Sequence, residues 1–304
     1  MNTSEPIAYY NGRFLPRSQL AVRVEDPGFV LGVTVSERLR TFGGHLFRLS
    51  SHLERLDHSL EIVGVDIGLD HQQLTGIAER LVTHNHALLE TGDDLGLILF
   101  ATPGLPSAPS QPAEPTVCLY TDPLPFGQWA DLYSRGQPLA VVDVRQVPGN
   151  CWPTELKCRS RMHYYLADRE AARKFPGSRA LLLDQQGFVS EASTANVLVF
   201  REQEGLISPP ARSILPGVTL GVNEELASGL GIPFIRRDLM VDDVAEADEL
   251  LLCSTSPCLW PVLQFNGRPV GNGRDPLVLP RLLDAWKQLV GMDFVAQAAR
   301  FRAR

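Results

Sequence analysis

Hydrophobic side chains recur along this chain with two periods, three to four residues in some segments and two in others. In residues 45–67 leucines lie three or four positions apart, which predicts an amphipathic helix. Ser50 or Ser51 is the expected N-cap, and Gly64 is the expected end. The leucines of that face are Leu49, Leu53, Leu56 and Leu60. Residues 71–90 repeat the spacing and predict a second helix.

Shorter apolar runs predict strands on either side of these helices. Residues 6–15 hold Asn11-Gly12 between two apolar arms, which is the sequence signature of a β-hairpin. Residues 20–26 alternate in a period of two, the pattern of a half-buried strand. Residues 95–102 form a continuous apolar run and predict a buried strand.

The rest of the chain alternates between the same two kinds of segment. The expected strands are 115–121, 139–145, 180–184, 188–191, 195–200, 233–237, 249–253 and 261–270. The expected helices are 161–175, one that opens at Gly217 and stops near Gly229, and 277–290. Seven prolines between 103 and 127 predict a loop over 103–114 and a linker near 122–133. This order predicts an α/β or α+β fold in two parts that meet near residue 125.

The composition favours a globular protein with a small-molecule ligand. The 304 residues carry 28 basic and 35 acidic side chains, a net charge of −7, so we expect neither nucleic acid nor an anionic membrane as a partner. No apolar run reaches the roughly 18 residues of a membrane span. Residues 1–14 lack the charged start and apolar core of a secretory signal, and the five cysteines form no Cys-x-x-Cys pair. We therefore expect reduced thiols in a cytoplasmic protein.

Lysine is rare in this sequence, and its scarcity draws attention to one position. There are three lysines among 28 basic residues, namely Lys157, Lys174 and Lys287. Lys157 follows a proline-bearing turn and precedes a helix, whereas the other two fall on polar helix faces. An amine can lose its proton and attack a carbonyl, which a guanidinium does not do. Lys157 is therefore a candidate nucleophile, with an ordinary surface lysine as the alternative.

Three further segments place chemically useful groups next to predicted elements. Glu191 ends a strand that follows a turn at 184–187, so its carboxylate is either at a cavity or on a solvent-facing edge. Residues 215–219 open a helix whose free N–H groups, with the Thr219 hydroxyl, suit a phosphate. Residues 254–256 supply three hydroxyls after a buried strand. Each feature alone is as consistent with a structural role. His84 and His86 point to different faces of their predicted helix, and we expect no metal site.

Taken in order, these segments resemble the class IV aminotransferases, the pyridoxal-phosphate enzymes of fold type IV. That family includes branched-chain and D-amino-acid aminotransferases and 4-amino-4-deoxychorismate lyase. The motifs that carry the resemblance are GFVLGVTVSERLRTFGGHLFRLSSHLERL, LK at 156–157, GFVSEASTAN, LPGVT and ADELLLCSTSPCLWPV. The resemblance covers nearly the whole chain. It implies a two-domain α/β (α+β) fold of the D-amino-acid aminotransferase type, with a smaller N-terminal domain at 1–122, a linker at 123–133 and a larger cofactor-binding domain at 134–304.

The resemblance also implies a cofactor, pyridoxal 5'-phosphate, and a role for individual residues. Lys157 would form a Schiff base with the cofactor, and Glu191 would keep the pyridine nitrogen protonated so that the ring accepts electrons from the substrate Cα. The implied ligands of the cofactor phosphate are Arg55, Val218, Thr219, Ser254 and Thr255. The implied substrate contacts are Glu37, Arg40, Arg161 and Ser256. The family also implies a homodimer.

Departures from the family pattern leave the substrate open. Leu95-Gly96-Leu97 stands where a Tyr-x-Arg is found in relatives, and Leu220 stands where an arginine often follows LPGVT. The tyrosine that several branched-chain enzymes carry a few residues after the lysine is absent, with tyrosines only at Tyr164 and Tyr165. We expect an aminotransferase that moves an amino group between a branched-chain-like amino acid and a 2-oxo acid. The alternatives are an aminodeoxychorismate lyase that releases pyruvate and 4-aminobenzoate, and a non-catalytic cofactor-binding protein.

Overall fold

The computed structural model describes residues 5–106, 110–271 and 273–303, and the chain forms two compact units. Unit 1 comprises Met1–Leu124 and Leu156–Ser160, and unit 2 comprises Pro125–Glu155 and Arg161–Arg304. The chain leaves unit 1 at Leu124, within the predicted linker, returns for the five residues that include Lys157, and leaves again. The predicted domain bounds of 1–122 and 134–304 contain no such return and remain a prediction.

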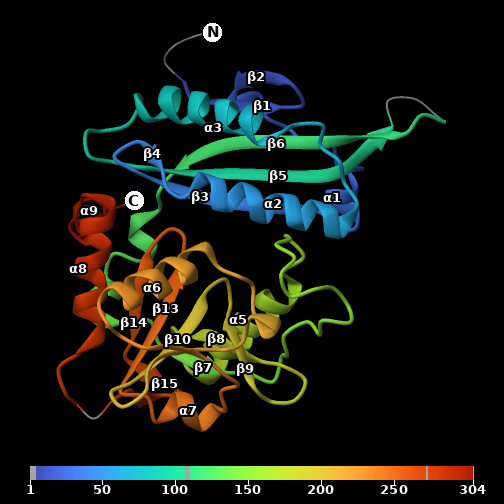
Figure 1. The fold of residues 1–304 in the computed structure, drawn as a ribbon. Coiled ribbons are helices and arrows are strands. Elements are labelled where there is room, and N and C mark those ends of the chain that lie inside the picture. Colours follow the sequence, from blue (N-terminus) through green and yellow to red (C-terminus); the bar gives the residue numbers. More distant parts are fainter. Residues whose placement is uncertain (1–4, 107–109, 272, 304) are drawn as a thin grey trace. The chain divides into compact units, whose positions relative to one another are not determined.

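Unit 1 is built on one antiparallel sheet of six strands in the order β2-β1-β6-β5-β3-β4 (Figure 1). The strands are β1 (Ile7–Tyr10), β2 (Arg13–Pro16), β3 (Val35–Phe42), β4 (His45–Leu46), β5 (Leu95–Pro106) and β6 (Ala113–Pro123). The helices are α1 (Pro27–Val30), α2 (Leu49–Val63) and α3 (His71–His86). Leucines of α2 and α3 join the apolar residues of β1, β3, β5 and β6 in one core, so burying the two predicted amphipathic faces stabilises the unit.

Most local predictions for unit 1 are confirmed. Asn11 and Gly12 have φ of 42° and 83° and join the antiparallel β1 and β2 as a tight hairpin turn. Gly64 ends α2 in the left-handed region, at φ 69°. The predicted N-cap is wrong, because Ser50 and Ser51 lie inside α2 and Arg48, at φ 53°, occupies the cap.

Two further predictions for unit 1 are wrong. Residues 20–26 form no strand. Val22 and Val24 are 38% and 66% exposed, so the alternation of apolar and polar residues in this segment does not correspond to a buried face. The predicted loop at 103–114 is wrong at both ends, since β5 continues to Pro106 and β6 begins at Ala113; residues 107–109 of the predicted loop lie outside the described residues. In the described part of the chain, β5 pairs beyond Ala101 with β6 and no longer with β3. The edge of β5 that β3 has left needs no backbone N–H, so proline, which lacks one, is tolerated there.

Unit 2 holds two sheets of five strands, in the orders β12-β11-β10-β13-β14 and β16-β15-β7-β8-β9 (Figure 1). The strands are β7 (Leu139–Val141), β8 (Arg179–Leu183), β9 (Val189–Ala192), β10 (Asn196–Arg201), β11 (Gly205–Ser208), β12 (Phe234–Arg236), β13 (Glu249–Ser254), β14 (Cys258–Val262), β15 (Gln264–Phe265) and β16 (Arg268–Pro269). The helices are α4 (Leu132–Arg135), α5 (Met162–Lys174), α6 (Val218–Gly229), α7 (Val241–Ala245), α8 (Val278–Val290) and α9 (Phe294–Arg300). Alanines of α5 pack on β7 and β8, and α6 packs on β13 and α8.

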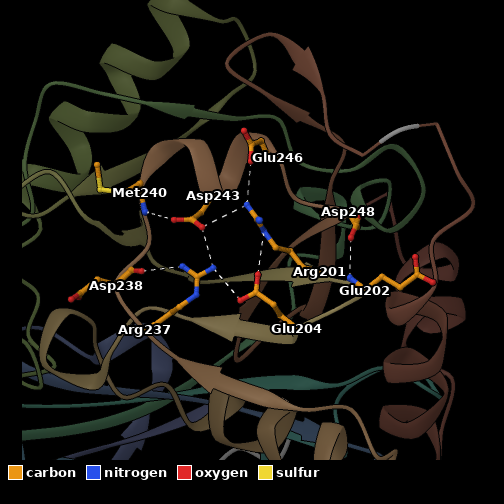
Figure 2. Close-up of polar contacts among 9 residues, drawn as sticks. All are labelled: Arg201, Glu202, Glu204, Arg237, Asp238, Met240, Asp243, Glu246 and Asp248. Atoms are coloured by element: carbon orange, nitrogen blue, oxygen red, sulfur yellow. Dashed lines mark hydrogen bonds and ion pairs between the residues drawn. The ribbon is translucent and has the colours of Figure 1, made fainter.

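Charged side chains of unit 2 also form a network between the β10–β11 turn and α7 (Figure 2). Arg237 lies 3.0 Å from Asp243 and 3.4 Å from Glu204, and Arg201 lies 3.6 Å from both Asp243 and Glu246. Partly exposed pairs of this kind stabilise a fold by roughly 0–1 kcal/mol each. Because each charge in the network has an opposite partner, we interpret it as a structural feature.

Candidate active site

Lys157 belongs to a short segment of unit 1 that lies beside the start of β3. Its carbonyl oxygen accepts a hydrogen bond from Ser36 N–H at 3.0 Å, and Arg159 N–H donates to Thr34 O at 2.9 Å. The Lys157 N–H donates to Ser59 Oγ, on α2, at 3.2 Å. The backbone of the candidate nucleophile is therefore held between a strand and a helix, which fixes where its side chain begins.

A buried cluster of ionisable groups occupies the same region of unit 1. Glu37, on β3, is 1% exposed, and its carboxylate accepts hydrogen bonds from Arg55 Nε and Nη2 at 2.8 Å each. His52 Nδ1 lies 2.7 Å from the same carboxylate. Burial alone would raise the pKa of Glu37, but the charge and hydrogen bonds of Arg55, with smaller effects of His52 and Lys157, lower that pKa to about 2. Glu37 is therefore a carboxylate at neutral pH.

His52 carries no charge in this cluster near neutral pH. Burial lowers the pKa of His52, and the positive charges of Arg55 and Lys157 lower it further, against the opposing effect of Glu37. A neutral imidazole within 2.7 Å of a carboxylate donates through Nδ1–H. Glu37 thus receives hydrogen bonds from two α2 residues one turn apart, and the Glu37–Arg55 pair uses two of the five guanidinium N–H groups.

Arg40 lies on β3 but does not share the cluster of Glu37. Since side chains alternate along a strand, residues 37 and 40 point to opposite faces of the sheet. Arg40 Nε donates to Thr41 O at 3.2 Å, and its guanidinium lies 4.0 Å from the centre of the Phe42 ring. The structure therefore does not bring together the two substrate contacts implied on this strand, and each role remains a prediction.

Glu191, the predicted partner of the pyridine nitrogen, is 5% exposed on β9 of unit 2. Gln146 Nε2 and Tyr164 Oη donate to its Oε1 at 2.7 and 2.5 Å. Leu215 N–H donates to its Oε2 at 3.2 Å. Three donors from three separate segments fix this carboxylate, so the alternative of a solvent-facing glutamate is wrong.

The same segment that contacts Glu191 leads into α6. Gly217 is the N-cap of α6, no side chain in the described part of the chain caps the helix, and Thr219 in its first turn is 7% exposed. Asn196 Nδ2 donates to Leu215 O at 3.0 Å, and a Cβ on Gly217 would lie 2.1 Å from Asn196 Oδ1. Only glycine fits there without a shift. Glu191 and the helix start at Val218 are therefore held by one continuous stretch, residues 215–218.

The hydroxyls of residues 254–256 follow β13 and lie at the end of the β10–β13 pair where Asn196 begins β10. Asn196, the first residue of β10, pairs with Cys253 near the end of β13, and Ser254 then pairs with Cys258 across a tight turn. Thr255 and Ser256 are in that turn, and Ser256 is 8% exposed. Unit 2 thus brings Glu191, the α6 start and the 254–256 hydroxyls to one end. Arg161, the remaining predicted contact, is the N-cap of α5.

Several residues of this site have no individual signal in the sequence. Gln146 and Leu215 contact Glu191 from irregular segments, and nothing in their local pattern indicates it. His52 could be found, because it lies three positions before Arg55 on a predicted helix and therefore on the same face. Among the residues that the structure describes, no His, Cys, Asp and Glu groups gather as metal ligands, and no helix is long and apolar enough to cross a membrane.

Comparison with known proteins identifies the class to which this fold and these residues belong. The family model for amino-transferase class IV matches residues 34–265, more than half of the chain. The chain therefore belongs to the class IV aminotransferase family, and the family predicted from the motifs is confirmed.

Individual relatives agree with the family. The chain is 27% identical over 288 residues to a D-alanine aminotransferase of Staphylococcus aureus strain COL, covering 93% of this chain and 97% of the relative. It is also 27% identical over 285 residues to a protein of Methanocaldococcus jannaschii named "Putative branched-chain-amino-acid aminotransferase", covering 92% and 95%.

Solved structures show the same fold. The branched-chain amino acid aminotransferase of Escherichia coli superposes with a TM-score of 0.85 at 23% identity, covering 94% of this chain and 95% of that one. The branched-chain aminotransferase of the archaeon Thermoproteus uzoniensis, solved with norvaline, gives a TM-score of 0.81 at 24% identity, with the same coverage. The predicted type IV fold is confirmed.

Proposed function

We propose that this protein is a pyridoxal 5'-phosphate-dependent aminotransferase that moves an amino group between a branched-chain-like amino acid and a 2-oxo acid. The observation that carries the proposal is a lysine, Lys157, whose backbone is held by β3 and α2 in a chain of the class IV family. The relatives are named for aminotransferase activity on D-alanine or branched-chain amino acids, and they support the reaction class.

The groups present suit this cofactor. A helix start at Val218 and Thr219 without a side-chain cap, the hydroxyls of Ser254 and Thr255, and the Arg55 guanidinium are the donors that a dianionic phosphate requires. The buried Glu191 carboxylate suits a protonated ring nitrogen. A related enzyme was solved with pyridoxamine 5'-phosphate. When bound, this cofactor supplies an aldehyde that captures amines and a ring that withdraws electrons from the substrate Cα.

The residues of the chain then have separate tasks. Lys157 would hold the aldehyde covalently until a substrate amine displaces it, and its released neutral amine would then move a proton at the substrate Cα, a task worth roughly 10² to 10⁴ in rate. Glu191 would accept a hydrogen bond from the ring nitrogen. Arg161 and Ser256 are proposed to bind the substrate. Glu37 and Arg40 are also proposed as substrate contacts; Glu37 accepts hydrogen bonds from Arg55, and the Arg40 guanidinium lies over Phe42.

Further properties of the protein follow from the family and are part of the proposal. We propose amino acids and 2-oxo acids as its small-molecule partners, and a homodimer as its assembly. A cytoplasmic location is consistent with the five cysteines, all of which are free thiols.

A spectrum followed by chemical trapping tests the attachment site. The purified protein is reconstituted with pyridoxal 5'-phosphate, reduced with borohydride and digested, and the modified peptide is mapped. The proposal expects the label on Lys157 and the loss of the visible band in Lys157→Ala. Lys174→Ala and Lys287→Ala are matched controls, since these lysines pair with Glu170 and Asp293 at the surface and should leave band and label unchanged. A band retained by Lys157→Ala refutes the assignment.

A second experiment separates the transferase from the lyase. Turnover of D-alanine and of L-leucine is measured with and without 2-oxoglutarate, and aminodeoxychorismate is supplied alone in a parallel reaction. An aminotransferase turns over only when the 2-oxo acid is present. Pyruvate and 4-aminobenzoate formed without any 2-oxo acid would establish the lyase, and no reaction with any donor by the loaded protein would indicate a non-catalytic cofactor-binding protein.

A further inference from the structure

We propose that Tyr164 is a positioning residue for Glu191, acting with Gln146 to saturate Oε1 of the carboxylate and so to direct Oε2 at the cofactor ring nitrogen. This inference rests on the proposed function, because it assigns the ring nitrogen to Glu191. It concerns residues of unit 2 alone, and neither Tyr164 nor Gln146 has a role in the site described so far beyond contact with the carboxylate.

Two short hydrogen bonds meet at one oxygen of the Glu191 carboxylate. Oε1 accepts from Tyr164 Oη at 2.5 Å and from Gln146 Nε2 at 2.7 Å, whereas Oε2 accepts from Leu215 N–H at the longer distance of 3.2 Å. A carboxylate oxygen offers about two lone-pair sites. Two short bonds use both sites of Oε1, so a further donor is directed to Oε2.

The direction of each bond is set by its surroundings. Burial raises the pKa of Tyr164 well above its ordinary value, and the negative charge of Glu191 raises it further, so the phenol remains protonated and donates. Gln146 Oε1 accepts from Val147 N–H at 2.9 Å, which leaves the amide nitrogen to face Glu191. Both groups are therefore permanent donors near neutral pH.

The two donors are themselves fixed in position. Gln146 is tied to β8 by its own N–H, which donates to Leu183 O at 2.9 Å, and Gln185 Nε2 donates to the Gln146 carbonyl at 2.9 Å. Tyr164 lies in the first turn of α5 and packs on the alanine-rich core beneath that helix. A carboxylate held by two anchored donors cannot rotate without breaking a charge-assisted bond, each worth on the order of tenfold to a hundredfold in an equilibrium constant.

Tyr164 lies close to Lys157 in the sequence, although the two residues belong to different units. Tyr164 follows Lys157 by seven residues, and Lys157 belongs to unit 1 while α5 belongs to unit 2. One short stretch of chain therefore supplies both the proposed attachment point of the cofactor and the residue that orients the acid on its ring nitrogen.

The test reads the ring nitrogen directly. Wild type, Tyr164→Phe and Tyr165→Phe are reconstituted with pyridoxal 5'-phosphate labelled with ¹⁵N in the ring, and the nitrogen chemical shift and the cofactor dissociation constant are measured. Tyr165 is a matched control, as the next residue of the same helix with 60% exposure. We expect Tyr164→Phe to shift the resonance and to weaken binding on the order of tenfold, while the Lys157 peptide is still trapped by borohydride. Tyr165→Phe should match wild type.

Each outcome bears on one proposal or the other. If wild type binds no cofactor, the proposed function fails. If wild type binds but Tyr164→Phe retains the wild-type resonance, or Tyr165→Phe shifts equally, the positioning role is overturned. Should Tyr164→Phe fail to fold, Gln146→Met removes the other donor to Oε1 and must shift the resonance away from that of wild type, because it frees the same oxygen. An unchanged resonance in Gln146→Met then overturns the proposal.

Discussion

The Glu37 cluster gives a stability effect whose size and pH dependence follow from the structure. Replacing Glu37 by Gln keeps the shape of the side chain and removes its charge, which leaves the Arg55 guanidinium, 9% exposed, without its anionic partner. Loss of one member of a buried pair costs about 3–5 kcal/mol. The pKa of Glu37 gives a similar figure, since a fall from 4.5 to about 2 corresponds to about 3 kcal/mol of stability.

The sign of the pH dependence is fixed by the direction of that pKa shift. The folded pKa lies below the unfolded one, so the unfolded chain takes up the proton first as the pH falls. The contribution of Glu37 is therefore complete above about pH 4.5 and disappears toward about pH 2. We expect the stability difference between wild type and Glu37→Gln to be about 3 kcal/mol near pH 7 and to shrink across this interval.

The assay must follow unit 1. All four tryptophans, Trp129, Trp152, Trp260 and Trp286, lie in unit 2, so their fluorescence does not observe the cluster. Urea unfolding monitored by hydrogen exchange of β3 and α2 peptides does observe it. Asp57→Asn is the matched control, because Asp57 lies on the same helix, pairs with His71 and is 55% exposed, and it should change stability by less than about 1 kcal/mol. A wild type and a Glu37→Gln protein that lose stability in parallel would contradict this account.

Three further variants test other features. His52→Asn should be less stable than wild type near pH 7, and this stability difference should shrink by up to about 1.4 kcal/mol per pH unit below pH 6.5, because burial lowers the pKa of His52 and only the wild type must release that proton to fold. Hydrogen exchange of α2 measures the difference, and a difference that does not change with pH contradicts the reasoning. Gly217→Ala should cost about 1–3 kcal/mol in urea unfolding, and adding Asn196→Ala should relieve part of that cost, because the new Cβ meets Asn196 Oδ1 at 2.1 Å; strictly additive effects would exclude the clash. Gly104→Ala should cost about 3 kcal/mol or more, since its φ is +67° and the Cβ would lie 1.7 Å from Glu114 O; a Tm within a degree or two of wild type would argue against this geometry.

Local sequence signals predicted those elements whose cause is local. The Asn11-Gly12 turn, the Gly64 stop and the leucine spacing of α2 each depend on residues within a few positions, and all three are confirmed. The N-cap of α2 was wrong because two serines in the first turn resemble caps, whereas the strand before the helix delivers Arg48 to that position. The strands at 95–102 and 115–121 were predicted, but the extension of β5 to Pro106 and of β6 back to Ala113 was missed, because prolines are tolerated only where a strand edge has no partner, which is a property of the whole sheet.

In the candidate site, too, features with a local cause were predicted and contacts made by the tertiary structure were not. Lys157, Glu191 and the α6 start are recognisable in the sequence because their motifs are contiguous. Their partners are not, since Gln146, Tyr164 and Leu215 lie 45, 27 and 24 residues from Glu191 along the chain. Such contacts are made by tertiary structure, and no periodicity within a segment encodes them.

The five residues Leu156–Ser160 limit where the chain can be cut into fragments that each contain a whole unit. A fragment that ends at Leu124 would contain nearly all of unit 1 yet lack its lysine, and the edge of β3 at Ser36 would lose the carbonyl that covers it. The complementary fragment would contain Leu156–Ser160 as a loop between its own segments, without the strand to which these residues bond. A cut at the unit boundary after Leu124 therefore separates Lys157 from the strand that holds its backbone, whereas a cut after Ser160 keeps the two together.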